Sequence, residues 1–161
     1  MPRATSSRLR DRLQEWIALP TVTTAEMIGV WHGWAYDRES LFATLLSESS
    51  WLGKVFRSRE DVDALVFGSP RTLIGVVNRL MIAPFRLPED RRLVRHPLGA
   101  ATLEDRVLYG RRSAAMCYRL LPIVDHFRRI CDRRVMGLMQ IAGRTDPELF
   151  FALERRAHTV R

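Results

Sequence analysis

The sequence predicts an α+β protein that is mainly β, in which an antiparallel β-barrel is flanked by helices. The first reason is that short β-like runs alternate with tight breaks between residues 92 and 155, a pattern typical of an antiparallel meander. The second is that so long a meander buries one face, and closing it into a barrel removes its exposed edges. The third is size: 161 residues, 47% of them hydrophobic, suffice for one domain with one core.

The chain is expected to begin with a helix. Ser6 or Ser7 can cap this helix, its apolar residues recur on one face, and Pro20 ends it. We therefore expect residues 1–24 to contain a helix and a linker. Residues 25–161 are expected to form the barrel as a single domain.

Strands and helices are both expected between residues 25 and 84. Residues 27–36 and 51–57 have the pattern of strands, with aromatic residues and glycines interleaved. The helices expected here are a short one after Asp37 with an apolar face at Leu41, Phe42, Leu45 and Leu46, a helical turn capped by Ser58, and a longer helix from Ser69-Pro70 to Pro84.

Six short strands are expected in the second half of the chain. They are Leu93–His96, Thr102–Tyr109, Ser113–Arg119, Ile123–Cys131, Val135–Ile141 and Leu149–Arg155. Turn residues such as Gly110 and Pro122 separate them. The barrel domain would thus consist of two sequence modules, about 25–84 and 90–157.

The charge and the apolar runs of the chain limit the classes of partner that we expect. A net charge of +8 and a pI of about 10.8 permit nucleic acid, acidic ligands or a membrane surface as partners. Many arginines stand in adjacent pairs such as Arg111-Arg112, and neighbouring strand residues point to opposite faces, so no continuous basic stripe forms. Nucleic acid is therefore disfavoured. Apolar runs stay below the roughly 18–20 residues of a membrane helix.

The two cysteines, Cys117 and Cys131, form neither a disulfide framework nor a CxxC pair. We therefore expect a reduced, cytoplasmic compartment. Cys117 falls in an apolar strand, where it is expected to be a small core residue. No apolar segment follows the N-terminal arginines, so no secretory signal is expected.

Lys54 is the only lysine among 26 basic residues, and it lies in the apolar run 51–56. The pKa of a lysine falls readily on burial, and the neutral amine is a nucleophile or a base. Two interpretations are open. The side chain extends from a strand to solvent, or it supplies a cation or a base inside a pocket.

Residues 29–33 form a G-x-W-x-G run. Glycines within a strand permit bends and close backbone approach, as at a barrel corner, and Trp31 would then plug one end of the barrel. Further motifs follow in order: Trp51-x-Gly53-Lys54-x-Phe56, Val62-x-Ala64-Leu65, Ala115-Met116-Cys117-Tyr118, Pro122-Ile123-Val124-Asp125-His126-Phe127-Arg128, Met136-Gly137-x-Met139 and Phe150-Phe151-x-Leu153-Glu154-Arg155.

Together these motifs resemble the GXWXG protein family, in which a G-x-W-x-G module is fused to a C-terminal domain of unknown function. The resemblance covers roughly residues 26–156 and implies a small α+β protein with a lipocalin- or nitrobindin-like barrel. It implies no established reaction. Four positions depart from the family pattern: Arg38-Glu39 stand in place of Gly-His, and Arg119 and Gln140 stand in place of aspartates. If those groups share a chemistry, this chain has lost part of it or is adapted to another ligand.

Strand alternation places Asp125 among apolar residues, on the face that carries Ile123 and Phe127. An ionised carboxylate there costs several kcal/mol unless it is paired, so Asp125 is expected to be paired or protonated. The expected partners are Lys54, Arg112 and Tyr118. An Asp–Lys or Asp–Tyr pair in an apolar cavity could move a proton or hold a carbonyl. Alternatively, the pair is structural and fixes two strands.

The leading functional hypothesis is a cofactor-free cyclase or isomerase of specialised metabolism, which folds a hydrophobic small molecule into a reactive shape. Its candidate catalytic residues are Lys54, Asp125 and Tyr118. Its candidate ligand-binding residues are Trp31, Trp51, Phe56, Arg112, Met116, Phe127, Met139 and Phe151.

Two alternatives stay open: a non-catalytic carrier or sensor of a lipid-like ligand or haem, and a basic nucleic-acid interaction module. The four histidines show no metal-ligand spacing, and no phosphate loop or serine-hydrolase elbow is present in the sequence. We therefore expect no metal and no cofactor. A homodimer is left open.

Overall fold

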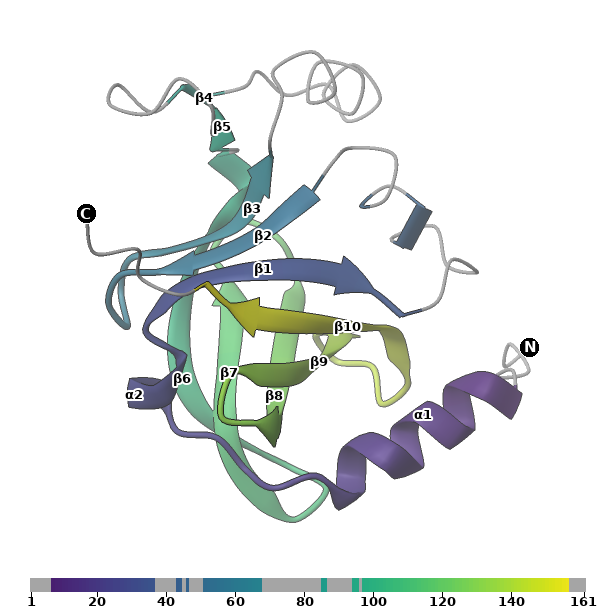
Figure 1. Ribbon diagram of the computed structural model, residues 1–161. Helices are drawn as coiled ribbons and strands as arrows, with labels where there is room; N and C mark the ends of the chain where they lie inside the picture. The colour runs from purple at the N-terminus through teal and green to yellow at the C-terminus, as the bar shows by residue number, and fades with distance from the viewer. Residues whose placement is uncertain are drawn as a thin grey trace.

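Eight strands close into an antiparallel barrel in the computed structural model (Figure 1). Their order is β2-β1-β10-β9-β8-β7-β6-β3, and an additional β2–β3 pairing closes the ring. Strands β5 and β4 extend the sheet beyond β3. The structure describes residues 7–36, 43–44, 46, 51–67, 85–86, 94–95 and 97–156. The predicted fold class, a mainly β antiparallel barrel with flanking helices, is confirmed.

The helices are α1 (Ser7–Ala18), α2 (Thr24–Met27) and the 3-10 turn η1 (Pro97–Gly99). The strands are β1 (Gly29–Ala35), β2 (Trp51–Phe56), β3 (Val62–Phe67), β4 (Phe85–Arg86), β5 (Val94–Arg95), β6 (Ala100–Leu108), β7 (Arg111–Tyr118), β8 (Ile123–Cys131), β9 (Arg134–Ile141) and β10 (Pro147–Arg155).

Aromatic rings fill the middle of the barrel. The Phe127 ring contacts Phe56 and Phe151 edge to face, with centroids 5.9 and 6.2 Å apart, and Trp51 meets Phe151 in the same way at 5.9 Å. Gly137 makes room for this packing, because a Cβ there would lie 2.2 Å from the Phe151 ring. One large ring therefore lies directly on the backbone of β9.

Helix α1 packs on the outside of the barrel (Figure 1). Its Trp16 is fully buried against Met136, Leu138 and Phe150, and the indole Nε1 donates a hydrogen bond to the Met136 carbonyl at 3.1 Å. The apolar stripe that predicted this helix is thus the face that covers β9 and β10.

One end of the barrel is closed by Trp31 and helix α2. The Trp31 indole donates to the Met27 carbonyl at 2.7 Å, and the Arg155 guanidinium stacks over its ring at 4.5 Å. Arg155 also donates to the carbonyls of Ile28 and Glu26. The predicted role of Trp31 as a plug at one barrel end agrees with this arrangement.

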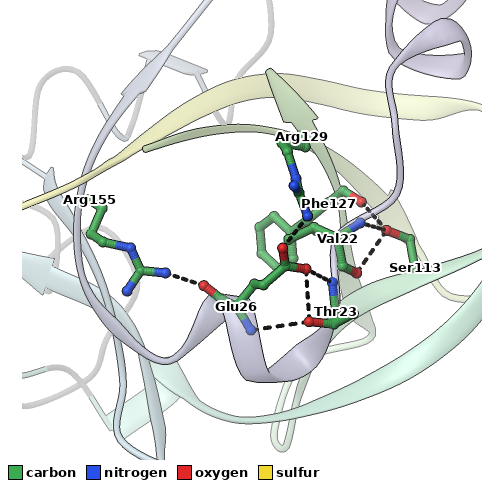
Figure 2. A network of polar contacts seen from close by, with 7 residues as sticks. All are labelled: Val22, Thr23, Glu26, Ser113, Phe127, Arg129 and Arg155. Atoms are coloured by element: carbon green, nitrogen blue, oxygen red, sulfur yellow. Dashed lines mark hydrogen bonds and ion pairs between the residues drawn. The ribbon is translucent and has the colours of Figure 1, made fainter. Parts of the chain in front are cut away.

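Figure 2 shows how the segment before α2 is held at this closed end. Ser113 Oγ accepts a hydrogen bond from the Val22 amide at 3.0 Å and lies 2.6 Å from the Phe127 carbonyl, to which its hydroxyl donates. The Thr23 side chain caps α2 by accepting from the Glu26 amide, and the Glu26 carboxylate accepts from the Thr23 amide, which completes a capping box. Glu26 also forms an ion pair with Arg129.

Two predictions about local structure are wrong, and one strand was not predicted. Residues 57–60 form bends in the β2–β3 connection and not a helical turn, although Ser58 Oγ accepts from the Glu60 and Asp61 amides as a cap would. The segment that follows is strand β3, which was not predicted. Cys117 is not a core residue, because its thiol lies on the outer face and donates to Glu104 at 2.7 Å.

Two predicted helices involve residues that the structure does not describe. Of the short helix after Asp37, Ala43, Thr44 and Leu46 are helical, whereas Leu41, Phe42 and Leu45 lie outside the described residues. The helix expected from Ser69-Pro70 to Pro84 also lies outside them. The division into an N-terminal helix and linker over residues 1–24 and one barrel domain over residues 25–161 stays a prediction.

Candidate functional site

Lys54 points into the barrel and reaches no solvent, because only 3% of it is exposed. Its Nζ lies 3.0 Å from Asp125 Oδ2. The same nitrogen donates to the Tyr118 hydroxyl and to the Ala64 carbonyl, each at 3.3 Å. The interpretation that Lys54 extends from its strand to solvent is therefore wrong. The structure brings together the three predicted catalytic residues in one buried cluster.

Gly53 allows Lys54 to take this position. A Cβ at residue 53 would lie 1.9 Å from the Trp31 carbonyl oxygen, and the residue has a φ of 148°, which only glycine adopts readily. The pairing of β2 with β3 is irregular on both sides of Gly53. Trp51 and Lys54, three residues apart, can therefore both face the interior, which strict alternation would forbid.

Three aromatic rings surround the Lys54 ammonium. Nζ lies 5.1 Å from the Phe151 centroid, 5.3 Å from that of Trp51 and 5.5 Å from that of Tyr118. Ring faces at such distances attract a cation. The lysine therefore has a charge partner, two further acceptors and aromatic surroundings, which together replace water.

Burial governs the ionisation of the cluster. It lowers the pKa of Lys54 and raises the pKa of Asp125, while the attraction between the two charges opposes both shifts. The pKa of the Tyr118 phenol is raised well above its usual range, first by burial and then by the Asp125 charge. The acid and the base of the pair are thus brought closer in proton affinity than they are in water.

One polar atom of the cluster has no partner. Asp125 Oδ1 is buried and accepts no hydrogen bond, although Oδ2 is bound to Lys54. Buried carboxylate oxygens are nearly always hydrogen-bonded, so an exception needs an explanation. The strand partners of Asp125 are Met116 and Met139, which offer no side-chain donor.

Arg112, predicted as a partner of Asp125, is not at the site. It is exposed near the start of β7 and pairs with Val107, whereas Met116 is the β7 residue opposite Asp125. Four residues of strand separate the two positions, or about 13 Å. Alternation placed Arg112 on the correct face but not at the correct height along the barrel.

The other seven predicted ligand-binding residues all belong to one buried core cluster. Trp31 lies at its closed end. Trp51 and Phe151 surround the Lys54 ammonium. The remaining four are Phe56, Met116, Phe127 and Met139.

The positions that depart from the family pattern lie outside the barrel where the structure describes them. Arg119 is exposed and donates to the Glu60 carbonyl at 2.5 Å. Gln140 lies between the inward-facing Met139 and Ile141, and its amide contacts the Thr145 carbonyl at 3.4 Å. Arg38 and Glu39 lie outside the described residues. Neither described position takes part in the buried cluster.

Neither of two surface pockets lined by described residues borders the Lys54 cluster. One of about 210 Å³ lies at the closed end, lined by Trp31, Glu26, Arg129 and Arg155 among others. The second, of about 260 Å³, lies over α1 and is lined by Arg8, Asp11, Arg12 and Glu15. The predicted apolar cavity around the cluster therefore stays a prediction.

The sequence interpretation missed two groups at these sites. The Ala64 carbonyl was missed because β3 was not predicted, although the alternation of Val62, Ala64 and Val66 is a strand signal. The bonds that Glu26 makes were also missed, although the Thr23-x-x-Glu26 spacing is that of a capping box.

The described residues offer no cluster of metal ligands and no membrane-spanning helix. Within the described ranges, no three His, Cys, Asp or Glu side chains are grouped so that they could hold a metal ion. His32 is exposed and His126 lies on the opposite face of β8 from Asp125, so neither of these two offers a haem ligand inside the barrel. In the same part of the chain, no helix is both long and apolar enough to span a membrane.

Comparisons with known proteins agree with this architecture. Residues 14–71 match the model of the GXWXG protein family, and residues 99–155 match a domain of unknown function, DUF4334. A crystal structure of a protein from Thermomonospora curvata is similar with a TM-score of 0.72 and 32% identity, over 92% of this chain and 88% of that one. No curated protein matches. The chain belongs to the GXWXG protein family, with the DUF4334 domain as its C-terminal part.

Proposed function

We propose that this protein binds a hydrophobic small molecule inside the barrel and acts on it as a cofactor-free isomerase or cyclase. Lys54, Asp125 and Tyr118 are its proposed catalytic residues. The observation that carries the proposal is a lysine, a carboxylate and a phenol held around one nitrogen within 3.3 Å, inside an otherwise apolar barrel. Such a cluster can transfer a proton or polarise a carbonyl without a bound cofactor.

A purely structural role explains this cluster less well. Replacing a buried ion pair by apolar side chains is often neutral or stabilising by about 1–4 kcal/mol, so stability alone gives little reason to keep it. A structural pair also gains by satisfying both carboxylate oxygens, and Asp125 Oδ1 is left without a donor. A ligand that binds at Asp125 Oδ1 would account both for the presence of the buried ion pair and for the absence of a donor to this oxygen.

Access to the cluster is expected from the barrel end opposite Trp31. Ala35, Tyr118 and Leu121 pack on the core while remaining partly exposed, and Tyr118 belongs to the cluster itself. At the other end, Trp31 and Arg155 close the barrel. A substrate that enters beside Tyr118 would meet the polar groups before the packed rings of Phe56 and Phe127.

A non-catalytic carrier is the second candidate, favoured by a different observation. Lys54 has three acceptors for its three ammonium hydrogens, so the ammonium needs no ligand to complete its bonds. In a carrier, the cluster would orient a ligand without changing it. The two functions differ in whether the bound molecule is converted.

The test is to identify a ligand that co-purifies with the protein by native mass spectrometry, and then to measure its conversion. Isomerisation or cyclisation by the wild type, lost in Asp125→Asn and Lys54→Met at a temperature where circular dichroism shows both variants folded, is the expected result. Asp63→Asn is the matched control, because Asp63 is also a buried carboxylate in an ion pair, at 2.7 Å from Arg57, but lies outside the barrel. A ligand that binds and stays unchanged would favour the carrier. If both cluster variants turned the ligand over as fast as the wild type, Lys54 and Asp125 would have no part in the mechanism.

A further inference from the structure

The hydrogen-bonding groups that the buried cluster leaves free define the substrate that it can accept. Lys54 is saturated by Asp125, Tyr118 and Ala64. Tyr118 accepts from Lys54, and among the described residues no acceptor takes the proton of its own hydroxyl. Asp125 Oδ1 has no donor. The cluster therefore offers a substrate one acceptor, on Asp125, and one donor, on Tyr118.

Resting on the proposed function, we infer that the substrate is an enolisable carbonyl compound, with Asp125 as the base for its α-carbon and Tyr118 as the hydrogen-bond donor to its carbonyl oxygen. Asp125 Oδ2 and the Tyr118 hydroxyl both lie within 3.3 Å of the same Lys54 nitrogen, so a small molecule that entered the barrel beside Tyr118 would be able to contact both residues. Lys54, proposed above as catalytic together with these two residues, does not touch the substrate in this arrangement and acts as a positioning residue. Its saturated ammonium argues against attack of the amine on the carbonyl.

The proposed step is balanced without any cofactor. The α C–H bond breaks, an O–H bond forms at Asp125 Oδ1, the electron pair of the C–H bond forms the new C=C bond, and the π pair of the C=O bond moves to the carbonyl oxygen. The Tyr118 hydroxyl donates to that oxygen as its negative charge develops, which is where a fixed donor accelerates a reaction most. When the substrate carries a C=C bond next to the α-carbon, the product is a dienolate, and return of the proton to its γ-carbon moves the double bond and completes an isomerisation.

Cyclisation follows from the same intermediate. The enolate carbon attacks an electrophilic carbonyl carbon of the same molecule, and Asp125 returns its proton to the resulting alkoxide. No oxidant or reductant is consumed.

The surroundings of Asp125 suit the role of base. The neighbouring Lys54 ammonium keeps the carboxylate ionised, while burial raises its pKa above that of a carboxylate in water, which makes it a stronger base. Met116, Met139 and the rings of Trp51 and Phe151 keep the dielectric low, so each charge and dipole acts more strongly than in solution. The same environment favours an apolar substrate skeleton.

The probes for the test are 2-tetralone, its enol mimic 2-naphthol, and naphthalene as an apolar control of the same shape. The wild type is expected to bind 2-naphthol about tenfold more tightly than naphthalene, which corresponds to about 1.4 kcal/mol. It is also expected to exchange the α-protons of 2-tetralone for deuterium, as followed by NMR in D2O. Asp125→Asn should lose the exchange and keep naphthalene binding.

Tyr118→Phe provides a second variant, because it removes a single oxygen and keeps the ring. It should reduce both the exchange rate and the preference for 2-naphthol. Equal binding of naphthalene and 2-naphthol by the wild type, or undiminished exchange in Asp125→Asn and Tyr118→Phe, would overturn this inference and leave the proposed apolar binding intact. Failure of the wild type to bind any of the three probes would overturn both.

Discussion

Replacing Lys54 with methionine should strongly destabilise the protein. Methionine keeps the length and the apolar stem of the side chain, but removes the cation bound to Asp125 at 3.0 Å. The carboxylate, 2% exposed, would then be left without its counter-charge. Removing one partner of a buried ion pair costs about 3–5 kcal/mol, so we expect a loss of this size in the free energy of unfolding.

The double variant Lys54→Met/Asp125→Leu should recover most of this loss. It replaces the whole pair by apolar side chains beside Met116 and Met139, and such replacements are often neutral or stabilising. The difference between the single and double variants then measures the cost of an unpaired buried carboxylate. Urea denaturation followed by far-UV circular dichroism gives both values.

Lowering the pH tests whether the unpaired charge of Asp125 causes the loss of stability in Lys54→Met. Without Lys54, the pKa of Asp125 loses the interaction that lowers it and rises further above 3.8. A carboxyl group with a raised folded-state pKa stabilises the fold below the unfolded pKa and loses this contribution as pH rises through the folded pKa. The deficit of Lys54→Met should therefore shrink as the pH is lowered from near 7 to near 4.

The reasoning would be refuted if Lys54→Met were as stable as the wild type at neutral pH. It would also be refuted if the double variant were no more stable than the single one. The control is Arg144→Met, which breaks a mostly exposed ion pair with Glu148 at 3.3 Å. This change should cost less than about 1 kcal/mol and should not be rescued by acid.

Three further predictions concern other parts of the barrel. Burial lowers the pKa of His126 from 6.5 to about 4. The contribution of this shift to stability is therefore present above pH 6.5 and is lost as the pH falls toward 4, by at most about 3 kcal/mol. His126→Gln should flatten this part of the pH–Tm profile, and an unchanged profile would contradict the prediction. Gly137→Ala should cost about 1–3 kcal/mol in urea denaturation, because its Cβ meets the Phe151 ring at 2.2 Å, and the penalty should fall in a Phe151→Leu background. Arg155→Lys should lose the planar stack on Trp31 and one hydrogen bond to a carbonyl, which should lower the free energy of unfolding by about 1–2 kcal/mol. Equal Tm values for the variant and the wild type would show that a positive charge alone is sufficient at this position.

Faces of strands were predictable from the sequence because alternation is a local property. The predicted strand Ile123–Cys131 coincides with β8, and its inward-facing Asp125 lies in the core as expected. Lys54 was among the expected partners of Asp125 because a buried carboxylate requires a cation or a hydrogen-bond donor. Height along the barrel was not predictable, because it depends on strand register, and Arg112 was misplaced by four residues for this reason.

The errors near residue 60 have a different cause. Ser58 makes the same hydrogen bonds to following amides that a helix cap makes, so the local signal cannot distinguish a turn from a helix start. Pairing of the next segment with β2 decides the outcome, and that pairing is a tertiary contact. The irregular register around Gly53 likewise depends on the approach of the Trp31 carbonyl, which the sequence alone does not reveal.

The unmatched oxygen of Asp125 differs in kind from the other buried polar atoms of the described residues that lack a partner. Those atoms are guanidinium nitrogens of Arg128 and Arg134, and each of these arginines makes a hydrogen bond through another nitrogen and stacks on a tryptophan ring. Asp125 Oδ1 instead lies inside the barrel beside a lysine whose three hydrogens are already taken. A fold that needed only rigidity would gain by satisfying this oxygen or by removing the ion pair. This is the physical reason for proposing a bound molecule at Asp125.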